Sequence, residues 1–190
     1  MLLIDAGQQF SRSAPQWAPN RVLGDSTDGI CFAPPALREV DGNFCISQMP
    51  AILNYLGRKH GYVPTDLKEA AIELQVQLDV CDISGELFKV GRDAEGKAKF
   101  LGERLPNWFA HLNQHYEKKT GPYLLGDKLY TADFVFIVTM DALDFALGAD
   151  NVSAICPDGL KACRHNLSEK SFYATYLATA KPILFESMKA

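Results

Sequence analysis

The chain has 190 residues, of which 47% are hydrophobic and 22% are charged, and its formal net charge is −4. This balance is typical of a folded globular protein and excludes global disorder. The slight acidity gives no electrostatic reason to expect nucleic acid or an anionic membrane as a partner.

No apolar run approaches the roughly 20 residues that a membrane span needs, and the first ten residues lack the features of a signal peptide. We therefore expect a cytoplasmic protein without a membrane span; a processed N-terminus would leave an organelle as the alternative. The five cysteines are irregularly spaced and include no Cys-x-x-Cys pair, which favours free thiols over disulfides.

The first ten residues allow two interpretations. Leu2–Ile4 could form a strand, or the segment could be a helix that ends at Gly7 and is followed by the aromatic Phe10. Pro15 and Pro19 argue against the strand, because they leave no room for a helix directly after it.

The next stretch is rich in Pro, Ser, Asn and Gly, which predicts an irregular connection with Arg21–Leu23 as a candidate strand. Phe32–Leu37 then predicts a proline-fixed loop, and Asp41-Gly42 predicts a hairpin turn. Cys45–Gly57 predicts a strand that runs straight into an amphipathic helix, and Pro50 suits the first turn of that helix.

Gly61–Asp66 predicts a linker, in which Thr65 or Asp66 caps a long helix over Leu67–Lys89. The apolar spacing of this helix predicts which of its side chains are buried: Ala71, Leu74, Leu78, Cys81 and Leu87.

A polar break at Gly91–Gly96 separates that helix from another over about residues 97–117. Apolar residues on most sides from Phe134 onward predict a helix buried at the centre of a bundle.

This order of segments resembles the glutathione S-transferases, most closely the cytosolic Pi, Mu and Sigma classes. Tyr123–Phe134 is also similar to the Gly-Asp-x-x-Ser-x-Ala-Asp stretch that opens the central helix of their helical domain. The resemblance implies an α/β thioredoxin-like N-terminal domain over residues 1–61, a linker over 62–67 and an all-α helical bundle over 68–190.

The start of the chain resembles the family's first helix, so the resemblance implies an incomplete N-terminal domain without its first strand. In the family, the part before that helix carries the Tyr, or the Ser or Cys of other classes, that activates the glutathione thiol. If Met1 lies inside the helix, no residue of this sequence inherits that role, and we expect no catalytic residue.

The resemblance also implies a glutathione site around the turn before the Pro50 helix. Gln48 matches the Gln or Glu of the family's Gln-Ser turn, but Met49 replaces the Ser whose hydroxyl and N–H hold the γ-glutamyl carboxylate. Asp82 matches an Asp of the Pi class that reaches across a dimer interface toward the glutamyl amine.

Two further contacts are implied less directly. Pro35 matches the family's cis-proline, but the preceding Pro34 has no N–H to offer glutathione; if Pro34 is itself the cis residue, Ala33 could donate instead. Trp17 is a candidate contact to the glycine end of glutathione, although gapless counting places Asn20 at that position.

His111 and His115 stand four residues apart on a predicted helix, a spacing that could place both on one metal ion. No third ligand accompanies them in the sequence, so we expect no metal at these histidines.

Three functions follow. The first is a protein of the transferase fold that is catalytically compromised and serves as a structural or partner-binding subunit, as a homodimer or in a larger assembly. The second is an active transferase that conjugates glutathione to electrophiles. The third is a binder of apolar small molecules in a cleft between the domains.

Overall fold

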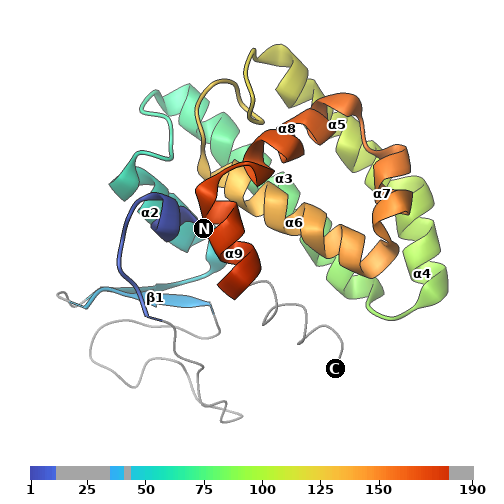
Figure 1. Ribbon diagram of the computed structural model, residues 1–190, viewed down its shortest axis with the longest axis horizontal. Helices are drawn as coiled ribbons and strands as arrows, with labels where there is room; N and C mark the ends of the chain where they lie inside the picture. The colour runs from blue at the N-terminus through green and yellow to red at the C-terminus, as the bar shows by residue number, and fades with distance from the viewer. Residues whose placement is uncertain (12–34, 41–43, 180–190) are drawn as a thin grey trace, which may run out of the picture.

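A computed structural model describes residues 1–11, 35–40 and 44–179 (Figure 1). It begins with a short helix, α1 (Leu2–Asp5), which Gly7 ends at a φ of 66°. The helical interpretation of the first residues is therefore confirmed. The candidate strand at Arg21–Leu23 and the predicted Asp41-Gly42 turn lie outside the described residues.

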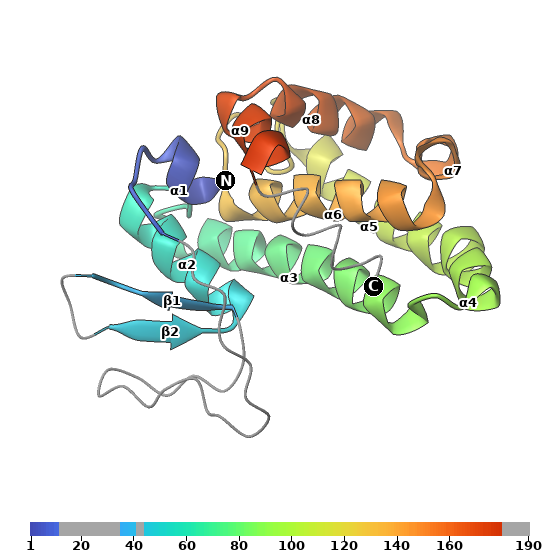
Figure 2. The same cartoon turned by 60° about the horizontal axis from the view of Figure 1, so that its bottom comes forward.

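The strands β1 (Ala36–Arg38) and β2 (Cys45–Ser47) form an antiparallel pair in which Ala36 lies opposite Ser47. The helix α2 (Met49–His60) follows β2 after a single residue. Figure 2 shows the hairpin at one side of the molecule, with α2 between it and α3. The predicted strand-to-helix segment is thus confirmed.

The linker after α2 has the predicted ends. Gly61 closes α2 in the left-handed conformation, and the Asp66 carboxylate caps α3 (Leu67–Val90) by accepting bonds of 3.0 Å from the N–H groups of Lys68 and Glu69. Of the two predicted caps, Asp66 is the one used.

The buried face of α3 differs from the prediction. Glu73 and Gln77 are fully buried, whereas Ala71 and Leu78 are exposed and only Leu87 of the predicted positions is buried. The prediction from apolar spacing was wrong because the side of α3 that packs on α6 carries Glu73 and Gln77. These polar side chains form hydrogen bonds with the start of α6. The remaining buried residues of α3 are Ala70, Val76, Val80 and Ile83.

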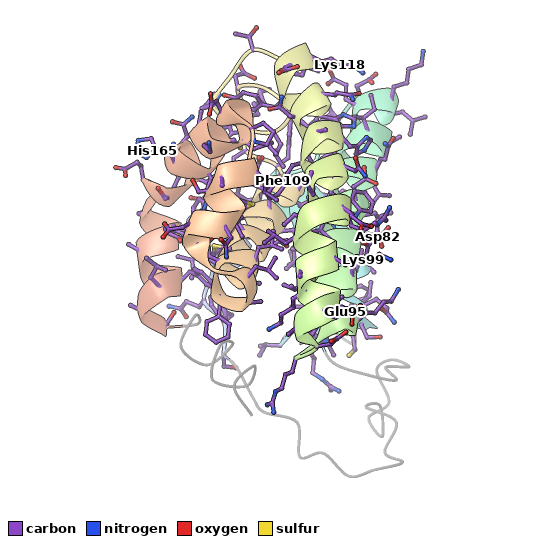
Figure 3. The ribbon with its side chains drawn as sticks, turned by 90° about the vertical axis from the view of Figure 1, so that its right-hand side faces the viewer. Asp82, Glu95, Lys99, Phe109, Lys118 and His165 are labelled. Atoms are coloured by element: carbon purple, nitrogen blue, oxygen red, sulfur yellow. The ribbon has the colours of Figure 1, made fainter. Side chains whose placement is uncertain are left out.

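The polar break after α3 is shorter than predicted, because Asp93 caps a further helix, α4 (Ala94–Lys99). A π-helical turn (Phe100–Arg104) joins α4 to α5 (Leu105–Lys118). Figure 3 shows Phe109 of α5 directed into the bundle, where it is fully buried.

The helix α6 (Thr131–Leu147) is the centre of the bundle, as predicted (Figure 1). It contacts α3 and α2 and is followed by α7 (Ala149–Ile155) and α8 (Asp158–Ser168), which pack on it. The helix α9 (Ser171–Thr179) returns to α1. No helix of the described residues is both long and apolar enough to cross a membrane.

The N-terminal end of α6, which we call the α6 junction, collects bonds from three other parts of the chain. Asp133 accepts the N–H of Tyr130 at 2.8 Å and that of Leu124 at 2.9 Å, and Glu73 of α3 accepts the N–H of Ala132 at 2.9 Å. Thr131 donates its hydroxyl to Glu73 rather than capping its own helix. Side chains from inside and outside α6 thus satisfy N–H groups that a helix end leaves unpaired.

A glycine lets α2 reach the α6 junction. A Cβ on Gly57 would lie 2.4 Å from the Thr131 side chain and 2.7 Å from that of Val63, closer than side chains tolerate. The N–H of Thr131 also donates to the carbonyl of Tyr62 at 3.0 Å. The junction therefore fixes α2, and with it the turn at Gln48, relative to the bundle.

We expect Asp133→Ala to destabilise the protein by about 2–4 kcal/mol, because it strips two buried N–H groups of their acceptor. Urea unfolding followed by circular dichroism measures the change. Asp150→Ala, which removes an exposed carboxylate from the first turn of α7, is the control and should cost less than about 0.5 kcal/mol. Equal losses in the two variants would contradict the role of the junction.

Candidate functional site

The turn between β2 and α2 is the most strained described part of the backbone. Gln48 has a φ of 73° and a ψ of 116°, and among the described residues it is the only one other than glycine with a positive φ. Such a conformation costs about 1–3 kcal/mol and is concentrated at ligand sites and switch regions. The Gln48 carbonyl starts α2 by accepting the N–H of Ile52 at 3.0 Å.

The first turn of α2 has backbone donors that the helix itself does not pair. Pro50 has no N–H, so the N–H groups of Met49 and Ala51 are the ones available before Ile52. No acidic side chain lies in this turn, and the Met49 side chain is 37% exposed. The positive end of the helix dipole therefore favours an anion such as a carboxylate at this turn.

The hairpin brings Pro35 to the same end as this turn. Pro35 directly precedes β1, and Ala36 pairs with Ser47, the residue before Gln48. Three residues of the predicted site, Pro35, Gln48 and Met49, thus share one end of the hairpin. Trp17, with Pro34, Ala33 and Asn20, lies outside the described residues.

Asp82 is placed apart from this turn. It is exposed on α3 and lies at the outer edge of the bundle in Figure 3. Within the described part of the chain, Asp82 makes no hydrogen bond or ion pair with the residues of the turn. A role for Asp82 at this site, as the resemblance implies it, would be played across a dimer.

A polar network that the sequence did not indicate ties β1 to α2. Glu39 accepts bonds from Lys59 and, at 2.6 Å, from the Tyr55 hydroxyl. The bond from Lys59, with the weaker one from Tyr55, lowers the pKa of Glu39. The Phe44 ring lies on Tyr55 with centroids 4.6 Å apart. These contacts hold the hairpin, and hence the turn, against α2.

A sequence model of the glutathione S-transferase C-terminal domain matches residues 84–180. The chain belongs to the glutathione S-transferase superfamily.

Two curated relatives of this transferase-family chain are of the Mu class. It is 32% identical over 106 residues to glutathione S-transferase Mu 1 of Macaca fascicularis, and equally to Mu 4 of Homo sapiens. Each alignment covers 54% of this chain and 47% of the relative, so the chain spans about half the length of the curated relatives it matches.

Solved transferases share the fold. A Caenorhabditis elegans glutathione S-transferase superposes with a TM-score of 0.72 and 25% identity, over 94% of this chain and 89% of that one. The Onchocerca volvulus Pi-class enzyme gives 0.66 and 20%, over 75% and 69%. The short sheet with α2 and the helices that follow therefore form a thioredoxin-like part and a helical part of the transferase fold.

The two histidines singled out in the sequence have a neighbour that the sequence did not reveal. His111 and His115 of α5 lie beside Asp79 of α3, with His111 Nε2 2.9 Å from Asp79 Oδ2. Burial, followed by the charges of His111 and Lys118, lowers the pKa of His115. The sequence motif did not reveal Asp79 because this side chain comes from another helix, and the expectation of no metal at the histidines stays a prediction.

We expect Gln48→Gly to stabilise the protein by about 1 kcal/mol, because glycine adopts the observed φ without strain and this gain exceeds its entropy cost. Gln48→Ala keeps the strain and is the matched control. Urea unfolding of the two variants gives the difference directly. A glycine variant no more stable than the alanine variant would contradict a strained turn.

Proposed function

We propose that this chain is a partner-binding subunit of the transferase fold, which pairs with a second copy of itself and does not conjugate glutathione efficiently. One observation carries the proposal. An apolar stripe of α3, which includes three of the side chains that the sequence predicts to be buried, lies on the outer face of the single chain. This α3 stripe consists of Leu67, Leu74, Leu78, Cys81 and Phe88.

The exposure of the α3 stripe is large for side chains of this kind. Leu67 is 81% exposed, Phe88 66% and Leu78 43%, and the other two members are partly exposed. Their spacing of seven, four, three and seven residues keeps them on one face of the helix. Contiguous exposed apolar side chains on one face are typical of a surface that another protein covers.

A second copy of the chain is the occupant that fits this stripe. The helix has 24 residues, and the stripe from Leu67 to Phe88 covers about 32 Å of its length. A two-fold axis across such a helix sets each stripe against its counterpart, so that one surface serves both partners. Asp82 follows Cys81 on this helix, and the resemblance implies contact across a dimer at that position.

The weak conjugation follows from two residues of the expected glutathione site. Met49 offers no hydroxyl to a carboxylate, and Pro34 offers no N–H. Each lost bond to a charged or buried group costs about 1–3 kcal/mol, so together they weaken binding by orders of magnitude.

We expect Leu78→Glu to convert the dimer to a monomer, because a carboxylate in the middle of a buried apolar interface has no partner there. Size-exclusion chromatography with light scattering measures the mass. Leu177→Glu, which changes an exposed leucine of α9, is the matched control and should remain dimeric.

A wild-type chain that stays monomeric at high micromolar concentration would overturn the pairing. Equal dissociation of both variants would also contradict a role for the α3 stripe.

An active transferase is the second candidate, and the conformation of Gln48 favours it. The residue with the positive φ directly precedes the first N–H groups of α2, and a helix N-terminus suits the γ-glutamyl carboxylate of glutathione. On this alternative, Gln48, the Met49 backbone, Pro35, Trp17 and Asp82 of a partner subunit would hold the tripeptide.

We expect Met49→Ser to tighten glutathione binding by about tenfold or more, because one charge-assisted hydrogen bond contributes about 1.5–3 kcal/mol. Calorimetric titration of the wild type, Met49→Ser and Met49→Ala gives the comparison, and the alanine variant should match the wild type. Micromolar binding by the wild type would favour the second candidate over the first.

A further inference from the structure

The contact between α3 and α5 carries polar pairs along its length. Lys119 lies 3.3 Å from Glu69 near one end, and Arg104 with Trp108 bonds to Glu86 near the other. The group of His111, His115 and Asp79 lies between these pairs in the sequence of both helices. It is the only group of three metal-ligating side chains found among the described residues.

This group differs from an ordinary ion pair because it contains two imidazoles. His111 Nε2 lies 2.9 Å from Asp79 Oδ2, and the His111 and His115 rings meet edge to face with centroids 5.2 Å apart. One ligand atom from each of the three residues lies within 4.8 Å of the others. The Asp79 carboxylate forms a hydrogen bond with His111. That bond does not account for the position of the second imidazole, His115, beside the same carboxylate.

We infer that Asp79, His111 and His115 bind a divalent transition-metal ion such as Zn²⁺, which links α3 to α5. Two imidazoles and a carboxylate are a ligand set that zinc and its neighbours take in proteins, with water at the open position. The side chains of His111 and Asp79 are 39% and 19% exposed, so an ion can enter from solvent and keep a water.

The geometry is close to what the ion needs. A tetrahedral zinc with bonds of about 2.0–2.1 Å holds its ligand atoms about 3.3 Å apart. Rotation of the side chains closes the remaining gap, since the helices already place all three on one side of the contact. His111 exchanges its hydrogen bond to Asp79 for a bond to the metal, and any proton on the coordinating nitrogens is released.

Calorimetric titration of the full, untagged chain with Zn²⁺, after removal of trace metal by a chelator, tests the site. We expect one ion per chain with micromolar affinity, and a rise in melting temperature because the ion binds only the folded state. Mg²⁺ should give neither effect, because it prefers oxygen ligands.

His115→Ala and Asp79→Asn should each weaken Zn²⁺ binding by at least about tenfold. Asp79→Asn keeps the size of the side chain, and so tests the ligand where the alanine variant folds poorly. His165→Ala is the control, because His165 is exposed on α8, away from α3 in Figure 3, and it should bind as the wild type does.

No saturable binding at millimolar Zn²⁺ would overturn the inference. Binding of equal strength in the wild type, His115→Ala and Asp79→Asn would also overturn it, because the ion would then lie elsewhere, for instance on a cysteine.

Discussion

The hydrogen bonds at the N-terminal end of α6 are the constraint on which the rest of the structure depends. Glu73 is fully buried, and burial raises its pKa although the bonds from Thr131 and Ala132 and the charge of Arg58 lower it. Burial likewise raises the pKa of Asp133 to about 7. These carboxylates are costly to bury, so their bonds to the start of α6 determine how α3 can pack on the bundle.

The same junction positions the candidate ligand turn. The close approach at Gly57 and the bond from Thr131 to Tyr62 fix α2 against α6, and the Glu39 network then fixes the hairpin against α2. Gln48 is held between β2 and α2, and this explains how a strained residue persists there. The position of a site at this end of the hairpin thus depends on the helical part.

The sequence predicted local features well and long-range partners poorly. Asp66, Pro50 and Gly61 carry their structural roles in their own chemistry, so the ends of α2 and the start of α3 were predictable. The buried face of α3 was not, because Glu73 and Gln77 are buried only through residues more than 50 positions away in the chain. Asp79 was missed beside His111 for the same reason, since the pair joins two helices.

The exposed apolar face of α3, which the sequence predicted to be buried in part, also connects the fold to the proposed function. Apolar residues that fail to reach the core of a single chain need another surface to cover them, and polar residues took the inner positions instead. On the proposed function, the chain keeps the transferase scaffold, whereas two groups that the resemblance implies for glutathione binding have changed, at Met49 and Pro34. The proposed partner-binding role rests on that division.

The rate at which the intact protein conjugates glutathione to a chlorinated nitroaromatic tests this division most directly. The account predicts a rate that does not exceed the uncatalysed reaction, even at millimolar glutathione. Saturable turnover at micromolar glutathione would contradict it.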